Sequence, residues 1–392
     1  MDEMQIKLND YGIRVHEHPG EIPATDWDAL LATQDCPTPF MQHAYLLAMH
    51  ESRSATPGSG WTARFFSLWH GDNMVAACPL YLKTHSYGEY VFDWAWANAY
   101  NQHGLDYYPK ALIAVPFTPV PGSRLLADSD EHRDMLLQAL VSWCADEKLS
   151  SLHLLFGSAA DIAATTRAEL LHRQTVQFHW QNLGWTDFDA FLVSLNQEKR
   201  KKIRQERRKV TEAGVLFRHV QGAAISDADW DFFYQCYERT YLEHGNAPYL
   251  TPDFFKRMRT DMAQNWLLFI AEREGKPMAS SLIGVQTEDG SNTVAYGRYW
   301  GALERVDCLH FEACYYQPLQ WCIANGVQRF EGGAQGEHKM ARALMPVSTH
   351  SAHWLADPRF SKAVEEFLNR EGRGVDNYLE HLDERNPFKR SA

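Results

Sequence analysis

Apolar residues along this chain gather in paired short runs, each pair joined by a turn that contains glycine. The run Trp61–Trp69 leads through Gly71 into the apolar stretch 75–82, and the run Trp266–Ala271 leads through Gly275 into 279–285. Such pairs predict two β-hairpins. Each is followed, further along, by a helix that carries a Trp-Cys pair and then by a strand, Ser151–Phe156 in the first half and Val327–Phe330 in the second.

This similar order of elements in the two halves has two interpretations. One is a duplication, which makes the protein two copies of one α/β unit. The other is a coincidence of hairpins and of the Trp-Cys pairs at 143–144 and 321–322. If the unit is duplicated, the cleft between the two copies is the expected binding site.

In the second half, a polar, glycine-rich segment follows the predicted strand–helix–strand order. A strand Thr293–Trp300, a helix Leu309–Ala324 and the strand Val327–Phe330 precede the segment Glu331–Lys339, which reads Glu-Gly-Gly-Ala-Gln-Gly-Glu-His-Lys. Ligands of open α/β sheets bind outside the carboxyl ends of the strands. We therefore expect this segment to form a site together with the end of the strand that holds Arg298.

A strongly basic helix is predicted between the halves, from Asn196 to a C-cap at Gly214. Only Ile203 and Val210 give it an apolar stripe, so most of its surface faces water. It is either a solvated connecting helix or a binding surface for phosphate groups of a cofactor, lipid carrier or RNA. The candidate phosphate-binding residues are Lys199, Arg200, Lys201, Arg204 and Arg207.

Helices are also predicted at Asp227–Glu243 and Pro252–Ala263, and an amphipathic helix at Asp357–Leu382 that breaks near Gly372 and Gly374. With 392 residues, the chain exceeds what one core supports, which is about 250–300 residues. We expect an N-terminal domain at 1–190, a connecting helix at 191–214 and a C-terminal domain at 215–392 that includes the last helix.

Net charge and cysteine content exclude several classes of protein. The net charge of −12 opposes binding of DNA through the whole surface, because such binding needs many Lys and Arg contacts. Seven cysteines without a Cys-x-x-Cys motif indicate reduced thiols rather than disulfides or a zinc site. No apolar run approaches the roughly 18 residues of a membrane span, and the N-terminus has no signal peptide pattern. A cytoplasmic protein is expected.

Several longer motifs carry a family resemblance. They are Trp-Ala-Trp-Ala at 94–97, Tyr-Tyr-Pro-Lys at 107–110, Pro-Phe-Thr-Pro-Val at 116–120, Gln-Phe-His-Trp at 177–180, Lys-Arg-Lys-Lys-Ile-Arg at 199–204, Gly-Arg-Tyr-Trp-Gly at 297–301, Leu-His-Phe-Glu-Ala-Cys-Tyr-Tyr-Gln at 309–317 and Gly-Ala-Gln-Gly-Glu-His-Lys at 333–339. Together they resemble the FemAB-like bacterial family, which is related to peptidoglycan biosynthesis proteins and to GNAT-type acyltransferases.

The resemblance implies an α/β fold of two tandem GNAT-like domains, with mixed sheets flanked by helices. It also implies transfer of an amino acid from aminoacyl-tRNA to a cell-wall precursor, and it matches the basic helix to one that Fem-type enzymes carry. The chain departs from GNAT enzymes before Leu309, where it lacks the glycine-rich turn that binds the pyrophosphate of acyl-CoA at a helix N-terminus. The absence of this turn argues against acetyl-CoA as the donor substrate. Acyl-CoA and aminoacyl-tRNA both stay open as donors.

Acyl transfer to an amine requires a base for the amine proton and donors for the oxyanion. The candidate catalytic residues are Glu337, His338, Glu331, Glu312 and Arg298, with Arg298, Lys339 or the backbone of Gly332–Gly336 as oxyanion donors. The candidate substrate-binding residues are Lys339, Gln335, Tyr299, Trp300, His310, Tyr315, Tyr316, Asp93 and Trp94.

Several candidates have a structural alternative. Glu337-His338 can be a solvated surface turn, and Glu312 a paired acid in the first turn of its helix. His310 and Cys314 have metal-ligand spacing but no evident third ligand, so no metal is expected. Asp93 lies in the expected strand Lys83–Trp94, where it either lines the cleft or anchors a buried network.

The favoured function is acyl or aminoacyl transfer to an amine, with a small molecule or a cell-wall precursor as acceptor, tRNA as a candidate partner and no DNA. The alternative is a non-catalytic GNAT-like module that binds a cell-wall or lipid-linked ligand.

Overall fold

The computed structural model describes residues 10–288, 291–334 and 336–389. The chain forms two compact units, Met1–Thr175 with Ser348–Asn377 and Val176–Val347 with Tyr378–Ala392. The first boundary thus lies before the expected residue 190, and part of the C-terminal segment belongs to the first unit. The reason is strand pairing, since β15 (Met345–Leu355) runs antiparallel to β8 (Ser151–Leu154).

The first unit contains two sheets. One orders its strands as β1 (Tyr11–His16), β3 (Phe65–His70), β4 (Asn73–Cys78) and β7 (Leu126–Ala127), and the other as β2 (Trp61–Ala63), β5 (Tyr81–Lys83), β6 (Lys110–Ile113), β8 and β15. Its helices are α2 (Ala24–Ala32), α3 (His43–Glu51), α4 (Trp94–Gln102), α5 (Asp130–Asp146) and α6 (Ala159–Arg167). The β3–β4 pair confirms the first predicted hairpin, with Gly71 at a φ of 58° in its turn.

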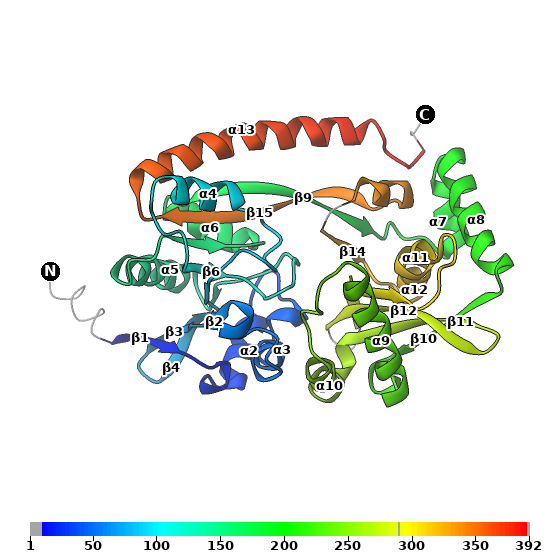
Figure 1. Cartoon of the computed structure of the whole chain (residues 1–392), viewed down its shortest axis with the longest axis horizontal. Helices are drawn as coiled ribbons and strands as arrows, with labels where there is room; N and C mark the ends of the chain where they lie inside the picture. Colours follow the sequence, from blue (N-terminus) through cyan, green and yellow to red (C-terminus); the bar gives the residue numbers. More distant parts are fainter. Residues whose placement is uncertain (1–9, 289–290, 335, 390–392) are drawn as a thin grey trace. The chain divides into compact units, whose positions relative to one another are not determined.

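The second unit is a mixed sheet with helices packed on it (Figure 1). Its strands follow the order β10 (Val215–Gln221), β11 (Trp266–Arg273), β12 (Lys276–Glu288), β13 (Ser291–Ala302), β14 (Arg329–Ala334) and β9 (Leu171–Gln181). Its helices are α7 (Phe188–Ser194), α8 (Gln197–Glu212), α9 (Asp227–Glu243), α10 (Pro252–Asp261), α11 (Leu309–Phe311) and α12 (Gln317–Ala324). The β11–β12 pair confirms the second hairpin.

Helices cover this sheet on both faces, because its strands alternate apolar side chains between them. Residues of α7, α8 and α12 share one core with Phe269, Ile283 and Ala295 of the sheet. On the other face, Tyr237 of α9 packs against Tyr299, with ring centroids 5.4 Å apart. Side chains on β13 and β14 are therefore directed toward one helical layer or the other.

Two expected elements are wrong. Helix α13 (Pro358–Asp383) is continuous through Gly372 and Gly374, as Figure 1 shows. Two glycines cost a helix roughly 1 kcal/mol each, and the packing of Phe360, Val364 and Leu368 into an apolar cluster of the first unit opposes that cost.

The segment Lys83–Trp94 is not a strand, because Gly88 and Tyr90 have φ values of 82° and 63°, which break extended structure. Glu89, Val91 and Asp93 are buried within an irregular loop, and Trp94 begins α4.

Candidate active site in the second unit

Strands β13 and β14 separate where the candidate residues begin. Their parallel register runs from Val294↔Arg329 to Tyr296↔Glu331, although β13 continues to Ala302 and β14 to Ala334. On the other edge of β13, Leu282 of β12 pairs with Tyr299, and Ile283 pairs with Gly297. Arg298 is thus the extra residue of a β-bulge, an irregularity that redirects side chains beside active sites.

A pocket of about 140 Å³ lies at this separation. Five residues proposed from the sequence line it, namely Arg298, Tyr299, Trp300, His310 and Tyr315. Glycine is needed at its wall, because a Cβ on Gly332 would lie 2.5 Å from Leu344 Cδ2. The structure therefore brings together the candidate residues of the strand and those of the helix. Strand β14 itself starts and ends later than the expected strand Val327–Phe330.

A π-helical turn, Glu312–Tyr316, interrupts the expected helix between α11 and α12. Such turns widen a helix by one residue and occur frequently at functional sites. Here the segment from α11 through the π turn supplies three lining residues, His310, Cys314 and Tyr315, and the His310 ring lies 5.5 Å from the Trp300 ring.

Polar groups of this pocket, and His338 and Lys339 near it, make hydrogen bonds. The Tyr315 hydroxyl lies 3.3 Å from His338 Nε2, and Arg298 Nη2 donates to the Tyr299 hydroxyl over 3.3 Å. Lys339 Nζ donates to the Gly333 carbonyl at 2.9 Å.

Burial changes the acid–base behaviour of these groups. It lowers the pKa of Lys339 to about 8 and the pKa of His310 to about 4. Burial, followed by Arg342 and Lys339, also lowers the pKa of His338. Both imidazoles are therefore neutral near pH 7 and able to accept a proton.

Glu331 lies beside this pocket but faces the other side of the sheet from Phe330 and Gly332, which line it. Its carboxyl is buried, and burial raises its pKa to about 7 despite Arg329 and Arg298. Arg329 Nε donates to Oε1 at 3.0 Å, whereas Oε2 has no hydrogen-bond donor within the described part of the chain. Glu331 therefore titrates near neutrality.

The family model FemAB-like, described as peptidoglycan biosynthesis/recognition, matches residues 19–390. The chain belongs to the FemAB-like family. This confirms the resemblance seen in the sequence motifs. A search of curated protein sequences found no match.

Solved structures agree on the fold of this FemAB-like protein. FemX is 10% identical with a TM-score of 0.54, covering 90% of this chain and 100% of its own. L-PGS from Bacillus licheniformis is 10% identical with a TM-score of 0.52, covering 90% and 98%. A tandem GNAT protein from the clavulanic acid biosynthesis pathway is 11% identical with a TM-score of 0.46, covering 89% and 99%. The first two of these structures confirm the expected mixed α/β fold with sheets flanked by helices.

Two candidate acids of the FemAB-like chain are held in ion pairs. Buried Glu312 accepts from Arg207 Nε at 3.1 Å and from Gln317 at 2.7 Å, which is the paired state that one interpretation expects. Glu337 is exposed and pairs with Arg385 at 2.8 Å. Gln335 lies outside the described residues.

Tyr316, a candidate substrate-binding residue, does not line the pocket but belongs to a buried cluster whose other members the sequence reasoning missed. Tyr316 donates to Glu206, and Arg342 Nη2 donates to the same carboxylate at 2.9 Å while its guanidinium lies 3.5 Å above the Phe311 ring. A signal was present for Glu206, since it lies three residues after Ile203 and four before Val210, on the apolar stripe of the basic helix.

Asp93 belongs to a buried network of the first unit. Its carboxylate accepts from Lys110 and, at 2.6 Å, from the Tyr107 hydroxyl. Burial disfavours its charge, but Lys110 and His153 outweigh that effect and bring its pKa to about 2. Trp94 is exposed, and its ring makes an edge contact with the Tyr87 ring, with centroids 5.0 Å apart. The structure thus shows Asp93 in the buried network that one interpretation expects.

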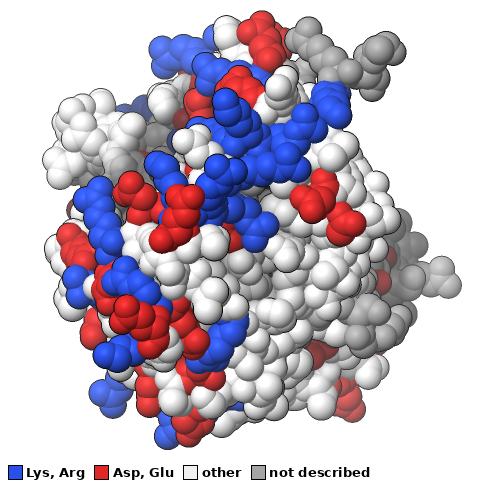
Figure 2. All heavy atoms as spheres, turned by 90° about the vertical axis from the view of Figure 1, so that its right-hand side faces the viewer, with Lys and Arg blue, Asp and Glu red and all other residues white. Residues whose placement is uncertain are grey.

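The basic helix α8 confirms the bounds predicted from its caps, with Asn196 as N-cap and Gly214 at a φ of 75°, whereas the first residues of the expected connecting helix 191–214 belong to the separate helix α7. Lys201, Arg204 and neighbouring cations are exposed, and Figure 2 shows Lys and Arg gathered on the side of the molecule where α8 lies. Arg207 instead pairs with Glu312. Among the described residues, no helix is long and apolar enough to cross a membrane.

Proposed function

We propose that this FemAB-like protein transfers an aminoacyl group from aminoacyl-tRNA to an amine, with a peptidoglycan-related precursor as acceptor. The observation that supports this best is the pocket between the separating ends of β13 and β14, which gathers Arg298, His310 and Tyr315. Cationic and hydroxyl donors beside neutral imidazoles are the groups that acyl transfer to an amine requires.

In the proposed reaction, the amine nitrogen attacks the ester carbonyl, a C–N bond forms, and the C–O bond to the ribose breaks. Arg298 and the Tyr315 hydroxyl stabilise the oxyanion. His310 accepts the proton that the amine loses and then donates it to the leaving ribose oxygen, which returns the imidazole to its neutral form. His338, whose Nε2 lies 3.3 Å from the Tyr315 hydroxyl, orients that hydroxyl as a positioning residue.

Arg298→Ala tests the active site. We expect transfer of labelled amino acid to an amine acceptor to fall by roughly a hundredfold, the typical loss for one oxyanion donor. Thermal melting should change little, because the Arg298 side chain lines a pocket rather than a core. Arg273→Ala on β11, which removes an exposed ion pair with Glu304, is the matched control and should keep full activity. Unchanged activity in Arg298→Ala would exclude this pocket as the site.

The donor is tested by salt dependence. In Lys201→Ala/Arg204→Ala, we expect tRNA binding to weaken and the magnitude of the slope of log K against log salt to fall by about 1.4–1.8, since each lost phosphate contact removes roughly 0.7–0.9. Lys276→Ala, an exposed lysine of the β11–β12 hairpin, should leave the slope unchanged. An equal slope in the two variants and the unmodified protein would indicate that α8 is a solvated helix that does not bind tRNA. Thermal stabilisation of the protein by CoA, with no tRNA binding, would identify acyl-CoA as the donor.

One observation favours the second candidate, a non-catalytic module that binds a cell-wall ligand. Glu312 and Glu337, two of the acids expected to act as bases, are held in ion pairs with Arg207 and Arg385. Under this candidate, the precursor binds but no donor supports turnover, and Arg298→Ala changes affinity only.

A further inference from the structure

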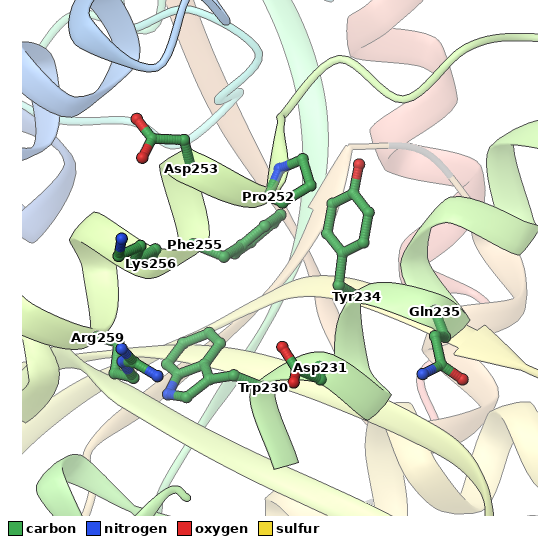
Figure 3. Close-up of a pocket in the computed structure, with 9 residues that line it drawn as sticks. All are labelled: Trp230, Asp231, Tyr234, Gln235, Pro252, Asp253, Phe255, Lys256 and Arg259. Carbon is green, nitrogen blue, oxygen red and sulfur yellow. The ribbon is translucent and has the colours of Figure 1, made fainter. Parts of the chain in front are cut away.

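A second, larger pocket of about 560 Å³ lies between α9 and α10 in the second unit. Its volume is within the range of small-molecule sites. None of its lining residues lines the pocket at β13 and β14. Figure 3 shows them: Trp230, Asp231, Tyr234, Gln235, Pro252, Asp253, Phe255, Lys256 and Arg259.

Trp230 gives this pocket an unused hydrogen-bond donor. The residue is 5% exposed, and its indole N–H has no acceptor within the part of the chain that the structure describes. A buried donor without a partner destabilises the folded state, because it has lost its hydrogen bonds to water. Figure 3 shows the indole nitrogen directed toward the side of the pocket where Lys256 and Arg259 lie. A ligand acceptor at this position would remove this destabilisation.

The charges at that side determine what kind of acceptor fits. Lys256 has no ion-pair partner among the described residues. Arg259 pairs with Asp227, whose side chain is 79% exposed. Exposed pairs contribute only about 0–1 kcal/mol, so an anionic ligand can compete with Asp227 for the guanidinium. Asp253 is already paired with Arg257 at 2.9 Å. The acceptor is therefore an anion.

The rest of the pocket has an aromatic wall and, beyond it, the acidic residue Asp231, whose charge is opposite to that of Lys256 and Arg259. Phe255 is buried, with its ring centroid 5.9 Å from that of Tyr234, and Pro252 extends this apolar wall. Figure 3 shows Asp231, Tyr234 and Gln235 on the side of Trp230 and Phe255 away from the two cations. A ligand that fills this space has an anionic end, an apolar body and room for a cationic end near Asp231.

We propose that this pocket binds an α-carboxylate attached to an apolar side chain, as in a free apolar amino acid or the C-terminal residue of a peptide. The carboxylate accepts from Trp230 Nε1 and pairs with Lys256 and Arg259. The side chain lies against Phe255 and Tyr234. In a free amino acid, the ammonium group lies toward Asp231.

Calorimetric titration of the full chain with three small molecules tests the proposal. L-Phenylalanine and N-acetyl-L-phenylalanine keep the carboxylate, whereas L-phenylalaninamide loses it. We expect the amide to bind at least tenfold more weakly than the better of the two acids. Binding of the free amino acid alone identifies an amino acid site, and binding of the acetylated form at least as well identifies a site for peptide C-termini. An amide that binds as tightly as the acids, or no binding of any of them at millimolar concentration, would overturn the proposal.

Two variants locate the binding. Trp230→Phe keeps the ring and removes the N–H, so we expect roughly tenfold weaker binding, as for loss of a hydrogen bond to a charged group. Lys256→Ala removes an exposed cation without touching a core, and we expect a decrease of roughly threefold. Arg257→Ala, on the same helix but not lining the pocket, should bind like the unmodified protein. Affinity unchanged in both Trp230→Phe and Lys256→Ala would place the ligand elsewhere.

Discussion

Gly301→Ala should lower the free energy of unfolding by more than about 3 kcal/mol, beyond the usual cost of overpacking. A Cβ at this position would lie 1.9 Å from the Cys236 carbonyl oxygen and 2.8 Å from Thr240 Oγ1. The first of these atoms is backbone of α9 and cannot rotate away. The glycine therefore allows α9 to approach β13 closely enough for Tyr237 to reach Tyr299.

Chemical denaturation of the full chain measures this effect. Gly372→Ala is the matched control, because its Cβ would meet nothing within 4 Å and its position is the interior of α13. The same substitution should there stabilise the protein by about 0.5–1 kcal/mol, since alanine is the better helix former. Equal midpoints for Gly301→Ala and the unmodified protein would contradict the close packing of α9 on β13.

Helices and hairpins whose ends are set by nearby residues, such as helix caps and turn glycines, could be predicted from the sequence. Both hairpins have glycine in the turn between apolar runs, and α9 begins and ends at the predicted residues because Ser226 caps it with Asp229. Helix α8 has an Asn196 cap and a left-handed Gly214. These signals lie within a few residues of each other, so no knowledge of tertiary contacts is needed to use them.

Features that depend on distant parts of the chain were not predictable. The bulge at Arg298 is set by the register of β12 against β13, and the π turn at Glu312 is associated with a pairing to Arg207, 105 positions away. Helix α13 continues through two glycines because tertiary packing overrides helix propensity. The sequence thus named Arg298, His310 and Tyr315 as candidates, but it did not show the pocket that they line together.

Glu331→Gln should make stability less dependent on pH. In the folded protein, burial raises the pKa of Glu331 from 4.5 to about 7. Between these values, the folded state keeps a proton that the unfolded chain releases, so this residue favours folding below pH 4.5 and progressively loses that contribution as the pH rises through 7. Glutamine has no such loss. We therefore expect the variant to gain about 2–3 kcal/mol relative to the unmodified protein between pH 5 and pH 8.

Denaturant titrations of both proteins at pH 5 and pH 8 give this difference directly. Glu337→Gln is the control, since it changes an exposed acid of the same segment that pairs with Arg385, and its effect should stay within about 0.5 kcal/mol at both pH values. If the Glu331→Gln gain is the same at pH 5 and pH 8, Glu331 is ionised in the folded protein at both. Its burial without a donor to Oε2 would then be offset by a charge partner, and it could not exchange a proton near neutral pH.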